Sequence, residues 1–99
     1  MNLKNLFHPR SVALIGASTE QNKLSGRPFR FFREYGYAGN VYPVNPKYPE
    51  IAGVPCFAKL SDIPGEVDLA VITLPATAVP QALAECGTKG IKAAAIISS

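Results

Sequence analysis

The chain has 99 residues, of which 47% are hydrophobic and 17% charged, and its formal net charge is +3 at pH 7. A chain of this length forms one small domain, and this composition is globular rather than disordered. It contains no apolar run of about 20 residues, no secretory signal and no recognisable nucleic-acid-binding module. We therefore expect a cytoplasmic protein that binds neither membrane nor nucleic acid.

The first predicted strand, residues 12–15, is fully apolar and runs into Gly16, Ala17 and Ser18. This pattern is typical of a nucleotide-binding α/β domain, in which a glycine after the first strand lets backbone N–H groups approach a diphosphate. The dinucleotide fingerprint G-x-G-x-x-G would also need glycines at positions 18 and 21, which are Ser18 and Gln21. The turn therefore predicts a phosphate site and disfavours an ordinary NAD site, with a simple tight turn at Gly16 as the alternative.

A helix is predicted after the polar loop that follows. Ser25 and Pro28 are suited to its first turn, because serine caps helices and proline is tolerated there. Phe29, Phe32 and Tyr35 then share one stripe, and the stripe predicts core packing rather than a platform for stacking bases.

The second predicted strand, residues 41–44, contains Pro43 and leads into a loop that Pro46 and Pro49 stiffen. This loop carries Lys47 close to where a Rossmann NAD site has an acidic residue for the ribose diol. An ammonium group instead suits a phosphorylated ribose, as in coenzyme A or NADP. Lys47 therefore predicts a basic ribose site, with a solvated surface lysine as the alternative.

Strands and helices continue to alternate in the second half of the chain. Residues 51–57 are predicted as a short extended piece, residues 61–65 as a brief helical turn and residues 68–74 as the strongest strand. Thr77 is placed to cap a helix that ends at Gly87 or Gly90, and residues 93–97 form the next strand. The alternation predicts an α/β fold, a Rossmann-like parallel sheet with flanking helices, cut short after the fourth or fifth strand.

Ligands of open parallel sheets bind beyond the carboxyl ends of the strands. Residues 16–18, 45–47, 74–75 and 98–99 all follow predicted strands, so we expect them at one edge. No metal site is predicted, because Cys56 and Cys86 have no ligand spacing with each other or with His8. The two cysteines are expected to be free thiols.

Five segments together resemble the CoA-binding domain of the NDP-forming acyl-CoA synthetases. They are SVALIGAS at 11–18, GYAGNVYPVNPK at 36–47, DIP at 62–64, VDLAVITLP at 67–75 and GIKAAAIISS at 90–99. The resemblance covers almost the whole chain, and the family includes ADP-forming acetyl-CoA synthetases and the α subunit of succinyl-CoA synthetase. It implies that residues 1–99 bind coenzyme A as an incomplete, N-terminal part of an acid-thiol ligase.

The resemblance also implies which residues contact coenzyme A. Gly16, Ala17 and Ser18 look like the turn that holds the diphosphate through N–H groups and the Ser18 hydroxyl. The basic contacts would come from Lys23, which is otherwise a surface lysine, and from Lys47, which the segment Pro43, Val44, Asn45 and Pro46 carries. Pro43 and Asn45 of that segment are also counted among the implied contacts.

Apolar and small residues complete the implied site. Leu74 and Pro75 look like a wall for the adenine or the pantetheine arm, unless Pro75 only ends a strand. Ile97, Ser98 and Ser99 match the segment that lines the thiol end of the cofactor.

Further synthetase domains or subunits are implied as partners. The family's ligases pass a phosphoryl group through a histidine in a later domain and bind nucleotide in an ATP-grasp domain, and neither lies in this sequence. His8 has no recognisable partner for general base chemistry, so no catalytic residue is predicted.

Two other functions stay open. The first is a standalone, non-catalytic module that binds coenzyme A or another nucleotide; a version that reads NADH is disfavoured by Lys47. The second is an NADP-dependent oxidoreductase, which the missing glycines weaken.

Overall fold

The computed structural model describes residues 9–18, 26, 28 and 39–97. Its elements are, in chain order, β1 (Ser11–Ile15), β2 (Asn40–Val44), β3 (Glu50–Ile51), β4 (Val54–Pro55), the 3₁₀ turn η2 (Leu60–Asp62), β5 (Leu69–Ile72), the 3₁₀ turn η3 (Ala76–Ala78), α3 (Val79–Lys89) and β6 (Ala93–Ile96). The aromatic stripe predicted for residues 29–35, together with Lys23, Ser98 and Ser99, lies outside the described residues.

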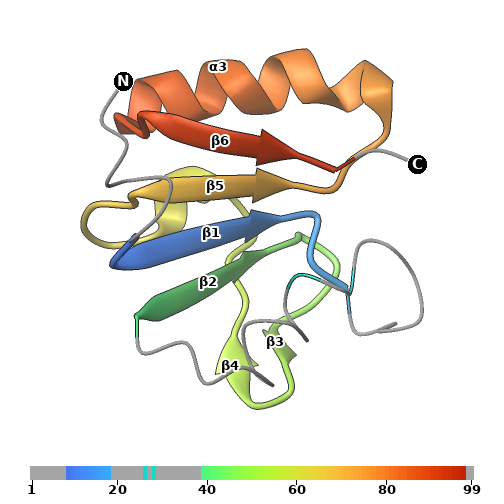
Figure 1. Cartoon of the computed structure of the whole chain (residues 1–99). Helices are drawn as coiled ribbons and strands as arrows, with labels where there is room; N and C mark the ends of the chain where they lie inside the picture. The colour runs from blue at the N-terminus through green and yellow to red at the C-terminus, as the bar shows by residue number, and fades with distance from the viewer. Residues whose placement is uncertain (1–8, 19–25, 27, 29–38, 98–99) are drawn as a thin grey trace.

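Four parallel strands form one sheet in the order β2-β1-β5-β6 (Figure 1). β1 is central, because Val12 pairs with Val41 on one side and with Leu69 on the other, and all five of its residues are buried. Burial on both faces explains why residues 12–15 of β1 and all of β5 are uninterrupted apolar runs rather than alternating ones. The parallel sheet and its helical crossover confirm the predicted α/β fold.

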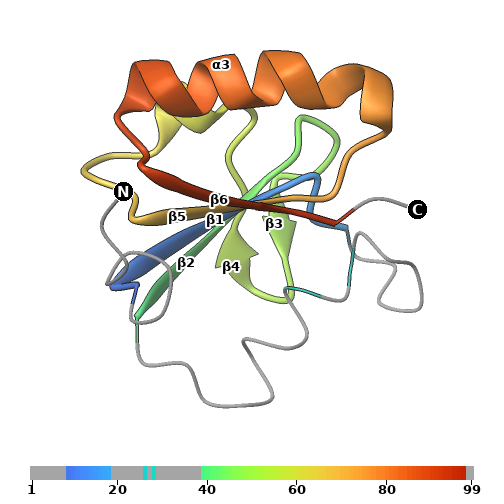
Figure 2. The same ribbon diagram turned by 45° about the horizontal axis from the view of Figure 1, so that its top comes forward.

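Apolar side chains fill both faces of this sheet. Ala13 and Ile15 belong to the cluster on the side of α3, which also contains Ile72 and Cys86. Their neighbours in β1, such as Leu14, belong to a second cluster on the opposite face. This division follows from the alternation of side chains along a strand, and Figure 2 shows α3 lying across the first of the two faces.

Backbone conformation, rather than side-chain capping, defines both ends of the helix α3. The predicted cap at Thr77 is wrong: the N-cap residue is Ala78, with no side-chain cap, and Pro80 stands in the first turn. Proline suits this position because the N–H that it lacks would have no partner inside the helix. The helix runs through Gly87 and ends at Gly90, whose φ of 87° is the left-handed conformation that glycine adopts readily.

Residues 51–57 are not the single extended piece that the sequence predicts. β3 and β4 pair antiparallel, with Glu50 opposite Pro55 and Ile51 opposite Val54. The two residues between them, Ala52 and Gly53, have φ values of 51° and 82°. Two central residues with positive φ are typical of a tight hairpin turn. This hairpin follows the loop that carries Lys47.

The buried thiol of Cys86 predicts a pH-dependent contribution to stability. The side chain is 3% exposed, and burial raises the pKa of the thiol, helped by the neighbouring Glu85 carboxylate. Because the folded chain disfavours the thiolate, the contribution is complete below the unfolded thiol's pKa of 9.0 and is lost as the pH rises through the folded value.

We therefore expect Cys86→Ala to be about 1 kcal/mol less stable than the natural chain at pH 7, with a smaller difference at pH 10. Urea unfolding of both proteins at the two pH values measures this difference. A difference that is independent of pH would contradict the assignment.

Candidate functional site

The carboxyl ends of the strands converge on one edge, as Figure 1 shows by the common direction of the arrows. Backbone hydrogen bonds join these ends. The Gly16 N–H donates to the Val44 carbonyl at 2.8 Å, and the Thr73 N–H donates to the Ile15 carbonyl at 2.9 Å. The Ile97 N–H donates to the Ile72 carbonyl at 2.9 Å. The described parts of the predicted edge segments therefore do lie together, and we call this region the carboxyl edge.

Gly16 is required by the fold itself. Its φ is +92°, and a Cβ built on it would lie 2.6 Å from the Thr73 carbonyl oxygen and 3.0 Å from Leu74 Cδ2. The space that the missing Cβ leaves is therefore filled by the end of β5. This differs from the reason inferred from the sequence, in which the space admits a diphosphate, and it places Thr73 and Leu74 directly beside the turn.

The first two N–H groups of the turn are engaged within the protein. The Gly16 N–H bonds to Val44, and the Ala17 N–H donates to the Leu14 carbonyl at 3.3 Å. Their predicted role as donors to a diphosphate is therefore not supported by this geometry, and they shape the turn instead. Ser18 is 6% exposed, with its Oγ 3.5 Å from the hydroxyl oxygen of Tyr48.

Asn45 connects the turn after β1 to the loop after β2. Its Nδ2 donates to the Ala17 carbonyl at 2.9 Å, and its Oδ1 accepts from the Lys47 N–H at 2.9 Å. The bond to Lys47 is an Asx turn, a local hydrogen bond that fixes the backbone two residues on. The structure therefore gives Asn45 a role in positioning both loops rather than a side chain pointed at a ligand.

Lys47 is exposed, and its ammonium nitrogen lies 5.6 Å from the centroid of the Tyr48 ring. That distance is within the range of a cation–π contact. Asp68 precedes β5 at the opposite end of the sheet, with its Oδ2 3.8 Å from Arg10 Nε, whereas Glu50 is exposed at the start of β3, three residues after Lys47. Of the described residues at the carboxyl edge (16–18, 45–47, 73–75 and 97), only Lys47 is charged, and its charge is positive.

The predicted apolar contacts differ in accessibility. Pro43 is fully buried and its carbonyl accepts from the Phe57 N–H at 2.9 Å, so its side chain packs in the core instead of facing a ligand. Leu74 and Ile97 are half-buried, and Pro75 is exposed just before η3. Leu74 and Pro75 therefore remain able to form a wall, whereas Pro43 acts by supporting the loop.

Sequence reasoning missed two residues at this edge, Thr73 and Tyr48. Thr73 Oγ1 donates to the Ile15 carbonyl at 3.1 Å, which holds the end of β5 against the turn after β1. A threonine in an otherwise apolar strand was the available signal for it. Tyr48 follows Lys47 directly, and an aromatic residue next to a candidate phosphate-binding lysine could have drawn attention to it.

Cys56 lies close to the same loop, and its Sγ is 3.5 Å from the Asn45 carbonyl. Burial raises the pKa of the Cys56 thiol, and the hydrogen bond opposes this effect. Both cysteines are free thiols, as predicted. Within the described ranges no His, Cys, Asp and Glu side chains gather in a way that could hold a metal ion. None of the helices described is long and apolar enough to cross a membrane.

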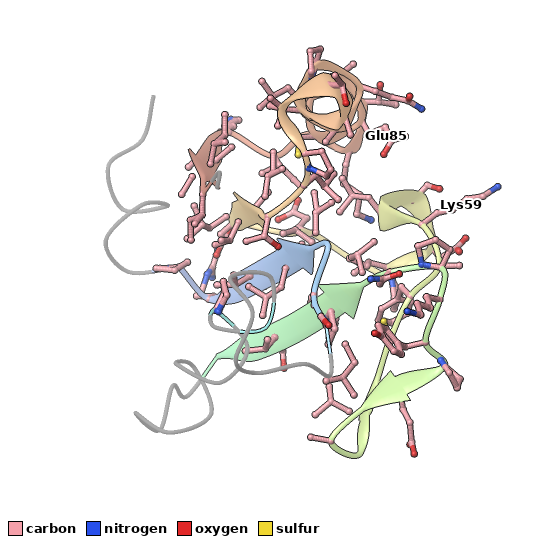
Figure 3. The ribbon with its side chains drawn as sticks, turned by 90° about the vertical axis from the view of Figure 1, so that its right-hand side faces the viewer. Lys59 and Glu85 are labelled. Atoms are coloured by element: carbon pink, nitrogen blue, oxygen red, sulfur yellow. The ribbon has the colours of Figure 1, made fainter. Side chains whose placement is uncertain are left out.

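A cavity of about 540 Å³ lies away from the carboxyl edge, between η2 and α3. Lys59 stands on one wall and Glu85 on the other (Figure 3). None of the residues predicted to bind a nucleotide lines it. A nucleotide site at the carboxyl edge would therefore be separate from this cavity and would use the loops after β1, β2 and β5.

Comparisons with known proteins agree with the fold. A family model described as "CoA binding domain" matches residues 10–99. Acetate–CoA ligase (ADP-forming) II of Archaeoglobus fulgidus is 45% identical over 98 residues, which are 99% of this chain and 15% of that protein. The α subunit of acetate–CoA ligase (ADP-forming) I of Pyrococcus furiosus is 48% identical over 103 residues, which cover 100% of this chain and 22% of the subunit.

A solved structure gives the same result. The apo form of the dinucleotide-forming acetyl-coenzyme A synthetase 1 of Ca. Korarchaeum cryptofilum superimposes with a TM-score of 0.94 at 40% identity, over 99% of this chain and 21% of that one. The chain thus spans about a fifth of the length of these relatives or less. Since the family model matches nearly the whole sequence, the chain belongs to the family of CoA-binding domains found in ADP-forming acyl-CoA synthetases, and its ligand is coenzyme A.

Proposed function

We propose that residues 1–99 are the coenzyme-A-binding portion of a larger ADP-forming acyl-CoA synthetase, an acid-thiol ligase of the acetate–CoA ligase type. The observation that carries this proposal is the family match over residues 10–99, combined with ligases as relatives at 45% and 48% identity. The relatives are several times longer than this chain, and the A. fulgidus protein matches over only 15% of its length. Other parts of the synthetase would supply the remaining chemistry.

The carboxyl edge has the chemistry that coenzyme A needs. Coenzyme A carries a diphosphate and a phosphorylated ribose, and the edge offers the exposed Lys47 ammonium, with the Ser18 hydroxyl, 6% exposed, in the turn after β1. Lys47 would meet the ribose 3′-phosphate and Ser18 the diphosphate. Leu74 and Pro75 would flank the adenine or the pantetheine arm. Lys23, Ser98 and Ser99 complete the proposed set from outside the described residues.

The domain would act by holding the thiol of coenzyme A in place. In the proposed reaction the sulfur attacks the carbonyl carbon of an acyl phosphate made elsewhere. The C–S bond forms, the C–O bond to the phosphate breaks, inorganic phosphate leaves and the thiol proton passes to the phosphate or to water. A phosphohistidine domain and an ATP-grasp domain, in the same chain or in a partner subunit, would make the acyl phosphate. The free thiols of Cys56 and Cys86 are compatible with the reducing cytoplasm that we propose as the location.

Removing the Lys47 ammonium tests the ribose-phosphate assignment. We expect Lys47→Ala to weaken coenzyme A binding by about 1–3 kcal/mol, because a charge-assisted hydrogen bond is lost. Dephospho-CoA, which lacks the 3′-phosphate, should bind the variant and the natural chain nearly equally. Calorimetric titration with both ligands measures this difference.

Lys59→Ala is the matched control, since Lys59 is an exposed lysine on the wall of the distant cavity. It removes one positive charge without touching the carboxyl edge and should leave both affinities unchanged. Equal binding of coenzyme A and dephospho-CoA by the natural chain would show that Lys47 does not read the ribose phosphate. A natural chain that binds neither ligand would contradict the carboxyl edge as a coenzyme A site.

A further inference from the structure

Tyr48 touches both of the groups that are proposed to meet coenzyme A. Its hydroxyl oxygen lies 3.5 Å from Ser18 Oγ, at the turn after β1. Its ring lies 5.6 Å from the Lys47 ammonium nitrogen, on the loop after β2. One side chain therefore bridges two segments that are 30 residues apart in the sequence.

The ring itself is held by the protein interior. Tyr48 is half-buried and packs against the cluster on the face opposite α3, which includes Leu14, Ala17 and Ile51. The Tyr48 N–H donates to the Asn45 carbonyl at 3.4 Å, so its backbone is also tied to the loop. A side chain anchored in this way has little freedom to move, and groups that rest on it have defined positions.

Such anchoring matters most for a lysine. A lysine side chain loses considerable rotamer freedom when it is fixed on a ligand, and this loss opposes binding. A cation resting on an aromatic face is already restricted before the ligand arrives, and the contact is favourable in itself. The ring of Tyr48 would therefore reduce the entropy that Lys47 loses when it meets a phosphate.

We propose that Tyr48 is a positioning residue for coenzyme A, whose ring places the Lys47 ammonium for the ribose phosphate while its hydroxyl places the Ser18 hydroxyl for the diphosphate. The inference rests on the function proposed above. It makes Tyr48 a determinant of specificity, because only the ring contact acts on the phosphate that distinguishes coenzyme A from dephospho-CoA.

Two substitutions separate the two roles. Tyr48→Phe keeps the ring and removes the hydroxyl, so we expect coenzyme A and dephospho-CoA to lose the same factor, about 2–5-fold. Tyr48→Met fills much of the volume without a ring, so we expect a further loss of about 3–10-fold for coenzyme A alone. The affinity ratio between the two ligands should fall only in Tyr48→Met. Calorimetric titration of the 99-residue chain measures both ligands.

Tyr42→Phe is the matched control. Tyr42 lies in β2 on the opposite face, where its ring meets Phe57 edge-on at 5.8 Å between centroids, and loss of its hydroxyl should change neither affinity. Nuclear magnetic resonance of the unmodified chain gives a second readout that does not depend on the folding of a variant. The methylene protons next to the Lys47 nitrogen should be shifted upfield by the Tyr48 ring, and an unshifted position would overturn the ring contact.

The outcomes separate this inference from the proposed function. If Lys47→Ala lowers the affinity ratio but Tyr48→Met leaves it at the natural value, the role of Tyr48 is overturned and the lysine site stands. If Lys47→Ala also leaves the ratio unchanged, both assignments fail. An unchanged affinity in Tyr48→Phe overturns the hydroxyl half of the inference.

Discussion

Replacing Gly16 by alanine should lower the free energy of unfolding by about 2–5 kcal/mol, a large part of what a small domain possesses. Two effects add. The left-handed backbone at φ +92° disfavours any residue with a Cβ by about 1–2 kcal/mol. The new Cβ would also lie 2.6 Å from the Thr73 carbonyl oxygen, which is backbone and yields only if β5 shifts, a strain of about 1–3 kcal/mol. Urea unfolding measures the sum.

Gly53 provides the matched control. Its φ of +82° is nearly the same, but nothing lies within 4 Å of a Cβ built there. Gly53→Ala should therefore show only the backbone effect, about 1–2 kcal/mol, and the difference between the two variants isolates the close contacts with Thr73 and Leu74. If the two alanine variants were equally stable, the close approach of β5 to the turn would not exist in solution.

Changing Asn45 to aspartate should damage the carboxyl edge in two ways, through its hydrogen bonds and through its charge. The substitution keeps the size of the side chain and an acceptor for the Lys47 N–H, but it puts a carboxylate oxygen where Nδ2 now donates to the Ala17 carbonyl at 2.9 Å. Two acceptors would then face each other, which costs about 1–3 kcal/mol of stability. The new charge would also stand beside the proposed ribose phosphate and offset the Lys47 ammonium.

We expect Asn45→Asp to weaken coenzyme A binding by more than about tenfold, or about 1.4 kcal/mol, and to lower the midpoint of urea unfolding. Asn40→Asp is the control. Asn40 is exposed at the start of β2, so this substitution adds the same negative charge at the opposite end of that strand. Similar affinities for the two variants would mean that Asn45 does not join the loops.

The backbone plan of this protein is accessible from its sequence because its signals are local. β1 and β5 read as buried strands since no polar residue interrupts their apolar runs, and the αL glycine at position 90 marks the end of α3. The start of α3 was not predicted correctly, because the helix begins with a preceding 3₁₀ turn and Pro80 in its first turn, not with a side-chain cap from Thr77. The hairpin was missed because its turn contains Ala52, a residue that rarely adopts positive φ.

The candidate site is predictable in place but not in detail. Strand ends identify the loops that share one edge of a parallel sheet, which predicts that Asn45, Lys47 and Ala17 lie at the same edge. Which loops are direct neighbours depends on the strand order β2-β1-β5-β6. Whether a polar group faces a ligand or the protein depends on contacts with segments far along the chain. The Gly16 N–H is occupied by Val44, and Pro43 is covered by the core, and neither fact has a local signature.

Because its contacts join residues far apart in the sequence, we expect the carboxyl edge, the proposed binding site, to form late in folding. Thr73 reaches Ile15 across 58 residues, and Asn45 reaches Ala17 across 28. Before such distant partners can contact each other, a large loop must close, and closing it costs conformational entropy. This cost slows folding. If the carboxyl edge binds coenzyme A, only molecules with a complete sheet can bind it. Coenzyme A would then stabilise the folded state relative to the unfolded state.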